Sequence, residues 1–160
     1  MSVEKIIADW KRGAFKPVYW LEGEEDYFID KVVDYAEHHI LNESEASFNL
    51  TVFYGKDANW PDVINACRRY PMFAERQVVL LKEAQQMRDA EKLESYVENP
   101  LASTVFVVSY KEKKLDARKK FAKLIKEKGV LLTTKKMYEN QLPEWTQELL
   151  QSKGLTISQK

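Results

Sequence analysis

Short apolar runs alternate with amphipathic stretches along this chain of 160 residues. The apolar runs have the length and the β-branched content of buried strands, and they cover residues 17–21, 48–54, 77–81, 104–109 and 130–133. Helices are expected between them, over residues 3–12, 26–39, from 60, over 90–98 and 116–128, with a last one from about 143. This alternation predicts an α/β fold with a five-stranded, mostly parallel sheet and helices on both faces.

Turn and capping residues refine these boundaries. Asp26 is a plausible N-cap after the turn at 22–26, and Asn59 precedes a helix that begins with Trp60 and Pro61. Residues 135–142 form a candidate boundary between two units. We therefore expect a main domain over 1–138, followed over 139–160 by the start of a second, truncated helical domain.

Composition places the chain among globular proteins, because 44% of the residues are hydrophobic and 31% are charged. The formal net charge is zero, so the overall charge gives no reason to infer nucleic-acid binding. One cysteine, Cys67, cannot form an internal disulfide or a multi-cysteine zinc site, which fits a reducing compartment. The chain shows no signal-peptide layout and no membrane-spanning apolar run, so we expect a cytoplasmic location and no membrane partner.

The turn after the first predicted strand is where a phosphate would bind in such a fold. It reads Glu22-Gly23-Glu24-Glu25-Asp26, with one glycine, no lysine and four carboxylates that would repel a triphosphate. We therefore expect no nucleotide and no other cofactor. His38 and His39 are adjacent on a helix and point in different directions, so they favour no metal site, and no catalytic set of residues can be identified.

A basic segment spans residues 111–128, with nine Lys or Arg against three acidic residues. Its apolar residues Ala117, Phe121, Leu124 and Ile125 form one stripe, which leaves most lysines on the solvent side. A solvated helix face is the simpler interpretation. The alternative is a nucleic-acid-binding α/β domain, with Lys119, Lys120 and Lys123 as possible DNA-facing residues.

Pro71 is followed by two large apolar residues, Met72 and Phe73, just before the predicted strand at 77–81. Proline disfavours continuing the preceding helix, so both residues are expected at an element junction near the surface. The residue types leave two interpretations open. Either the fold covers these side chains, or they protrude and occupy an apolar pocket of a partner.

Several segments, in this order, resemble one family. They are Lys16-Pro17-Val18-Tyr19-Trp20-Leu21-Glu22-Gly23-Glu24-Glu25, Tyr70-Pro71-Met72-Phe73-Ala74-Glu75-Arg76-Gln77-Val78-Val79-Leu80-Leu81, Val105-Phe106-Val107-Val108, Lys113-Lys114-Leu115-Asp116 and Gln141-Leu142-Pro143-Glu144-Trp145. The set is similar to the delta subunit of the bacterial DNA polymerase III clamp loader, over nearly the whole chain. The resemblance implies an AAA+-like fold without a functional P-loop, and a subunit that is not itself an ATPase.

In that family a hydrophobic pair before the third strand inserts into the sliding clamp (the beta subunit) and helps to open the ring for DNA replication. The matching residues here are Met72 and Phe73, with Tyr70 beside them. The family usually has Leu-Phe at the pair, and Met is close to Leu in volume. Members also carry a second helical domain and a collar, so this chain corresponds to their N-terminal portion. The resemblance further implies other clamp-loader subunits as partners of the intact protein, and DNA as an indirect partner.

A third and weaker alternative for the function of this chain is an unusual nucleotide-binding enzyme.

Overall fold

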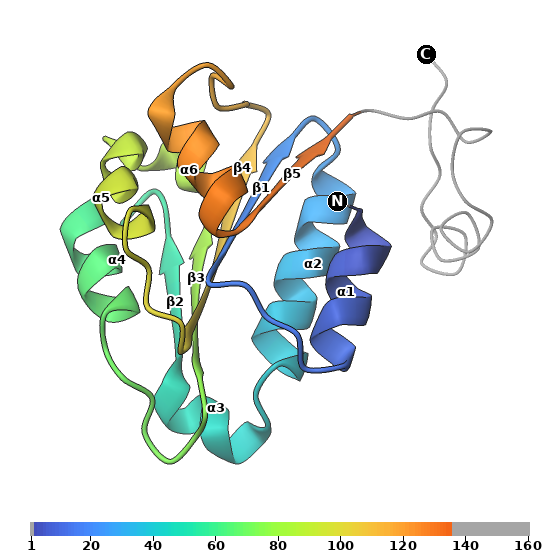
Figure 1. The fold of residues 1–160 in the computed structure, drawn as a ribbon, viewed down its shortest axis with the longest axis vertical. Helices are drawn as coiled ribbons and strands as arrows, with labels where there is room; N and C mark the ends of the chain where they lie inside the picture. The colour runs from blue at the N-terminus through green and yellow to red at the C-terminus, as the bar shows by residue number, and fades with distance from the viewer. Residues whose placement is uncertain (1, 136–160) are drawn as a thin grey trace.

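The computed structural model describes residues 2–135, which form a five-stranded parallel sheet with helices on both faces (Figure 1). The strand order is β2-β3-β4-β1-β5, and every neighbouring pair is parallel. The strands are β1 Val18–Gly23, β2 Leu50–Tyr54, β3 Gln77–Lys82, β4 Thr104–Lys111 and β5 Val130–Thr134. The predicted fold class is therefore confirmed.

Helical elements connect the strands. They are α1 Val3–Lys11, α2 Asp26–His39, α3 Glu43–Asn49, α4 Trp60–Cys67, the 3₁₀ turns η1 Ala84–Gln86 and η2 Ala90–Leu93, α5 Glu94–Val97, and α6 Lys120–Lys128. The Asn59 side chain accepts a hydrogen bond from the Asp62 N–H and so caps α4, as predicted. The helix expected over 90–98 is a 3₁₀ turn followed directly by α5.

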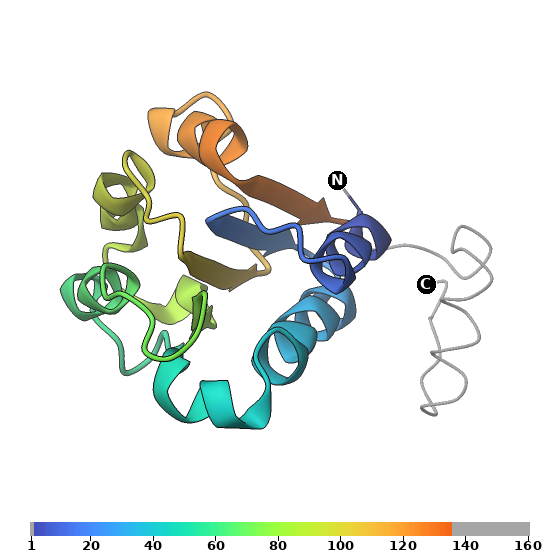
Figure 2. The ribbon, with the colours of Figure 1, turned by 60° about the horizontal axis from the view of Figure 1, so that its bottom comes forward.

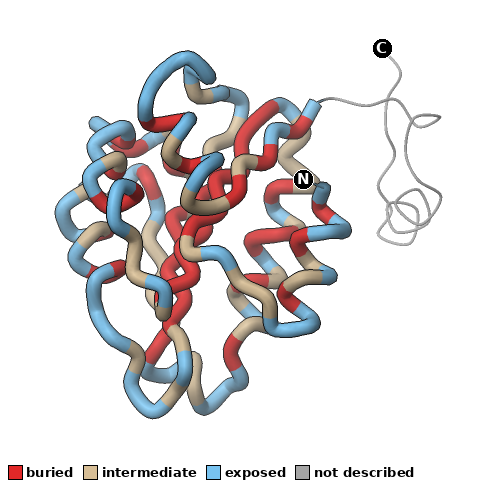
Figure 3. The backbone as a smooth tube through the Cα atoms, viewed as in Figure 1, coloured by how far each residue is buried: buried red, intermediate tan, exposed pale blue. Residues whose placement is uncertain are grey.

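The sheet is buried on both faces because successive strand residues point to opposite sides. Val18, Trp20, Val79 and Leu81 belong to a cluster with residues of α4, α5 and α6. The alternate residues, such as Leu21 on β1, pack with α1 and α2 on the other face. Figure 3 shows the result as a continuous buried band along the strands.

Several boundary predictions were wrong. β1 continues to Gly23, because Glu22 and Gly23 pair with both β4 and β5. The N-cap position of α2 is therefore Glu25, which makes no capping hydrogen bond, and Asp26 is the first helical residue. α6 begins at Lys120 rather than at 116, because the Asp116 side chain accepts the Arg118 N–H and forms a turn there.

The strand expected over 48–54 begins only at Leu50, because residues 43–49 form the helix α3. Asn42 caps this helix, and the Asn42 and Glu45 side chains exchange hydrogen bonds with each other's backbone N–H. Phe48 and Asn49 are consequently the last residues of a helix. This difference decides the geometry of the site described below.

The expected boundary at 138/139 and the helix expected from about 143 lie outside the described residues. Between residues 2 and 135, no helix is both long enough and apolar enough to cross a membrane.

Candidate partner-binding site

The loop over residues 68–76 joins α4 to β3 at the amino ends of the parallel strands. It exposes three large side chains, with Phe73 91% accessible, Tyr70 75% and Met72 54%. The core-packing interpretation of Met72 and Phe73 is therefore wrong for this fold. Figures 1 and 2 both show the loop beside α3, at the same end of the molecule.

Gln77, the first residue of β3, holds the start of this loop. Its side chain is buried, and Nε2 lies within hydrogen-bond distance of the carbonyl oxygens of Ala66 and Arg69, at 2.9 and 2.6 Å. It also reaches Thr104 Oγ1 at 2.9 Å. These carbonyls lie at and just beyond the C-terminal end of α4, where carbonyl oxygens lack the regular donors of a helix interior. Gln77 therefore fixes where the chain leaves the helix.

Asn49, the last residue of α3, holds the middle of the loop. The Met72 N–H donates to Asn49 Oδ1 at 2.7 Å, and Asn49 Nδ2 donates to the Met72 carbonyl oxygen at 2.8 Å. Nδ2 also lies 3.0 Å from the Glu45 carbonyl oxygen. Only 3% of the Asn49 surface is accessible, so these bonds are partly shielded from water.

At the end of the loop, the Arg76 guanidinium lies over the Phe15 ring, 4.2 Å from its centroid. The loop backbone is thus held near both ends and in the middle, while Tyr70, Met72 and Phe73 remain exposed. A fixed backbone with exposed apolar side chains suits recognition, because little order has to be gained on binding.

Phe48 belongs to the same surface, although the sequence analysis did not select it. It is 65% accessible, and its ring lies edge-on to Phe73, with centroids 6.3 Å apart. The apolar pattern predicts Phe48 as the first residue of a strand. The capping pair Asn42 and Glu45 was the readable signal that a helix precedes β2.

The opposite edge of the sheet, at the carboxyl ends of the strands, contains the acidic turn. There the N–H groups of Gly23 and Glu24 donate to the carbonyl oxygens of Lys113 and Thr134, and the Glu25 N–H donates to Thr134 Oγ1. Glu22 is 2% accessible and accepts from the Leu115 N–H and the Thr133 hydroxyl. Three amides of this turn, those of Gly23, Glu24 and Glu25, are therefore already bonded within the chain and not free to hold a phosphate.

Glycine is required at position 23 because β5 passes so close. The φ angle of Gly23 is 117°, a conformation that side chains rarely adopt. A Cβ there would lie 2.1 Å from the Thr134 carbonyl oxygen. Gly23 thus allows β1 and β5 to approach closely, whereas the glycines of a P-loop leave room for phosphate.

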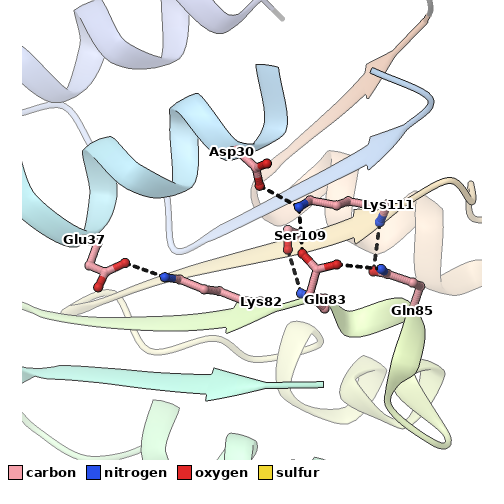
Figure 4. A network of polar contacts seen from close by, with 7 residues as sticks. All are labelled: Asp30, Glu37, Lys82, Glu83, Gln85, Ser109 and Lys111. Carbon is pink, nitrogen blue, oxygen red and sulfur yellow. Dashed lines mark hydrogen bonds and ion pairs between the residues drawn. The ribbon is translucent and has the colours of Figure 1, made fainter. Parts of the chain in front are cut away.

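A network of charged and polar groups covers the ends of β3 and β4 beside this turn (Figure 4). Lys111 Nζ lies 2.7 Å from both Asp30 Oδ1 and Glu83 Oε2. Gln85 bonds to Glu83 and to the Lys111 N–H, and the Glu83 N–H donates to Ser109 Oγ. A lysine of the chain itself therefore neutralises the carboxylates at the position where ligands of open parallel sheets usually bind.

The pKa directions agree with this arrangement. Burial alone would raise the pKa of Glu83, but hydrogen bonds from Lys111 and Gln85, together with the Lys111 charge, lower it below its ordinary value. Burial and the nearby Glu112 carboxylate raise the pKa of Asp26, against the Lys111 charge. Glu24, Glu25, Asp26 and Glu112 line an acidic hollow at this edge, which repels an anion.

The possible DNA-facing residues Lys119, Lys120 and Lys123 are all exposed at the start of α6. Lys120 Nζ pairs with Glu98 Oε1 at 3.0 Å, and this hydrogen bond raises the pKa of Lys120. One of the three lysines is therefore already neutralised by an acidic neighbour. Ala117, expected on the apolar stripe, is exposed because it precedes the helix.

Two further candidates are structural. Cys67 is buried, and burial raises the pKa of its thiol, so it is a packed side chain rather than a nucleophile. Within residues 2–135, no group of three or more His, Cys, Asp or Glu has the arrangement of a metal site.

Comparisons with known proteins identify related chains. A family model described as "DNA polymerase III, delta subunit" matches residues 19–135. The chain is 28% identical over 157 residues to the DNA polymerase III subunit delta of Bacillus subtilis. The Bacillus subtilis structure described as a DNA clamp loader delta protein superposes with a TM-score of 0.78, at 26% identity over 94% of this chain. A DNA polymerase III gamma-subunit-related protein of Thermotoga maritima, at 13% identity and a TM-score of 0.61 over 95% of this chain, has a similar fold.

These matches cover most of this chain but only part of each relative. The chain spans 45% of the length of the curated Bacillus subtilis relative, 48% of the matching Bacillus subtilis structure and 50% of the Thermotoga maritima chain.

Proposed function

This chain belongs to the DNA polymerase III delta subunit family, and from that premise we propose that it binds the sliding clamp of bacterial DNA replication and helps to open it. Met72 and Phe73 are the proposed anchors, and Tyr70 contacts the clamp beside them. The intact protein works with the other clamp-loader subunits and meets DNA indirectly, through the clamp. The observation that supports the proposal most directly is Phe73, a 91% accessible phenylalanine on a loop with a fixed backbone.

The exposure of these side chains has an energetic consequence. Covering an exposed apolar side chain with a partner is favourable, and it lowers the free energy by ~1.5–3 kcal/mol for a Met or Phe. Met72, Phe73 and Phe48 lie together at one end of the molecule, with Tyr70 on the same loop. An aromatic and apolar group of this kind is typical of the anchors at the centre of protein interfaces.

We further propose that this subunit has no enzymatic activity of its own and needs no cofactor. Binding a nucleotide in the usual place would require free amides in the turn after β1, and those of Gly23, Glu24 and Glu25 are bonded within the chain. Its contribution would then be mechanical, namely binding energy applied to the ring-shaped clamp.

The test is a binding titration of the full chain against a bacterial sliding clamp. The double variant Met72→Ala/Phe73→Ala should weaken binding by roughly a hundredfold or more, because two buried anchors are lost. Its melting temperature should barely change, since both side chains are exposed in the free protein.

Tyr54→Ala is the matched control. Tyr54 is also an exposed aromatic residue, but it lies at the carboxyl end of β2, whereas the loop over 68–76 lies at the amino ends of the strands. The control should bind the clamp as the unmodified chain does. Unchanged affinity of the double variant, or a large loss of its stability, would refute the proposed anchors.

The competing function is nucleic-acid binding through Lys119, Lys120 and Lys123. It remains a separate proposal, and the ion pair between Lys120 and Glu98 weakens it because that lysine is not free for phosphate. The degenerate nucleotide-binding enzyme is weaker still, given the occupied amides of the turn after β1.

A further inference from the structure

We infer that Asn49 is a positioning residue for clamp binding, which holds Met72 and Phe73 in the conformation that the clamp recognises. The inference rests on the proposed function and adds a part of the site that lies outside the loop. Asn49 does not reach the surface and so cannot itself touch a partner. Its role follows from what its side chain bonds to.

The Asn49 amide bonds to the backbone of Met72 in both directions, as a neighbouring strand would. It accepts from the Met72 N–H at 2.7 Å and donates to the Met72 carbonyl oxygen at 2.8 Å. Among residues 2–135, no other group bonds to either Met72 backbone atom. The position of the Met72 backbone therefore depends on a side chain 23 residues earlier in the sequence.

The next residue explains why that dependence matters. Phe73 has a φ angle of 58°, in the left-handed region that a bulky side chain seldom occupies. A residue keeps such a conformation only where its surroundings over-determine it. The bonds from Asn49 fix the chain immediately before Phe73, so they favour this conformation and direct the ring outward.

α3 orients the ring as well as the backbone. Phe48 precedes Asn49 in the helix, and its ring lies at 70° to that of Phe73, with centroids 6.3 Å apart. This edge-to-face contact restricts where the exposed Phe73 ring can turn. Asn49 thus makes the loop a preformed element, and without it part of the binding free energy would be needed to order the loop.

The test measures the clamp affinity of the full chain and of the variants Asn49→Ala, Met72→Ala/Phe73→Ala, and the triple combination. Asn49→Ala should weaken binding by about tenfold through loss of preorganisation. In the background that already lacks both anchors, the same change should cost less than about twofold, because its effect acts through them.

Asn59→Ala is the matched control for stability. Asn59 also bonds to backbone through its side chain, at the N-terminal end of α4, whereas the loop follows the other end of that helix. Both Asn→Ala variants should lower the melting temperature, but Asn59→Ala should leave clamp affinity unchanged. If both weaken clamp binding equally, the effect of Asn49 is one of general stability and the inference fails.

Asn49→Asp is a second variant, which replaces the donor by a carboxylate oxygen that faces the carbonyl oxygens of Met72 and Glu45. It should weaken binding at least as much as Asn49→Ala, because a buried acceptor then faces two other acceptors. Hydrogen exchange of the Met72 amide in the unmodified chain is an independent measurement, and it should be slower than that of the exposed Glu75 amide. If the Met72 amide exchanges as fast as the Glu75 amide, the hydrogen bond from Met72 to Asn49 does not hold the loop, and the inference fails.

The outcomes separate this inference from the proposed function. If Met72→Ala/Phe73→Ala binds the clamp normally, the proposed function itself is wrong. If that variant is weakened but both Asn49 variants bind normally, clamp binding stands and the positioning role of Asn49 is wrong. An equal loss from Asn49→Ala with and without the anchors would also overturn it.

Discussion

Phe73 combines a highly exposed aromatic ring with a left-handed backbone, and both features oppose stability in the free protein. The left-handed conformation costs a residue with a Cβ roughly 1–2 kcal/mol, whereas glycine adopts it without that cost. Strain and exposed apolar area of this kind are retained where a function needs them. The residue therefore provides a way to separate stability from binding.

Replacing Phe73 by glycine should give a protein that is more stable than the Phe73→Ala variant, by about 1 kcal/mol. The reason is that alanine keeps the strained Cβ, whereas glycine removes it. Both variants should lose clamp affinity to a similar degree, because both lack the ring. Urea unfolding and clamp titration on the same samples measure the two effects, and a glycine variant less stable than the alanine variant would contradict the strain.

The sequence predicted this site only in part. Pro71 before two large apolar residues was enough to place Met72 and Phe73 at a junction near the surface. Whether they were covered could not be decided, because that depends on which distant elements pack against the loop. Asn49 could not be identified for the same reason, since a side chain that bonds to backbone 23 residues away leaves no local pattern.

α3 shows where periodicity fails for a whole element. It has seven residues, and its last two, Phe48 and Asn49, are an exposed aromatic and a buried amide. That is the reverse of an amphipathic helix, so the apolar pattern extended β2 backwards instead. The apolar centres of β1, β3 and β4 were predicted, although not all of their ends, because buried parallel strands are apolar on both faces and this signal is local.

α6 gives a prediction about the basic segment. Changing Lys119, Lys120 and Lys123 together to glutamine should leave duplex DNA binding weak and nearly unchanged at physiological salt, because these lysines are solvated surface. Stability should barely change, since the Lys120–Glu98 pair is exposed. A titration over several salt concentrations measures this. Tight binding by the unmodified chain, with a steep salt slope that the triple variant loses, would favour the nucleic-acid alternative.

The two edges of the sheet differ in what they leave exposed. At the amino ends of the strands the loop over 68–76 presents apolar side chains on a fixed backbone. At the carboxyl ends, the usual ligand site, backbone amides and charges are paired within the chain. The proposed partner-binding surface thus lies at the amino ends of the strands, away from the usual ligand site of an open parallel sheet.

Lys111 is the central charge at the carboxyl ends of the strands, where it pairs with Asp30 and Glu83. Replacing it by methionine should lower the free energy of unfolding at pH 7 by about 1–3 kcal/mol, because the partly buried Glu83 loses its charged partner. Lys120→Met, which removes an exposed pair, is the matched control and should barely change the free energy of unfolding. Clamp affinity should stay unchanged in both.

The pH dependence of the Lys111→Met effect follows from Glu83. Its pKa is lowered in the folded protein, so the Glu83–Lys111 pair contributes stability above the pKa of Glu83 in the unfolded chain, and this contribution is lost as the pH falls through the folded value. The difference between the unmodified chain and Lys111→Met should therefore shrink as the pH is lowered from 7 to about 3. An equal difference at both pH values would show that the lysine acts through packing alone.

The last prediction concerns nucleotide, and it separates charge from geometry at the turn after β1. Acidic residues there would repel ATP, and changing Glu24 and Glu25 to glutamine would reduce this repulsion by removing two of the four carboxylates that line the hollow. The occupied amides would remain, because Gly23, Glu24 and Glu25 donate through their backbone to Lys113 and Thr134. We therefore expect that neither the unmodified chain nor the double glutamine variant binds ATP in an equilibrium titration, with a P-loop ATPase as the positive control. If the glutamine variant binds ATP at micromolar concentration, repulsion alone had excluded the nucleotide, and the bonds of β5 to this turn are weaker than the structure indicates.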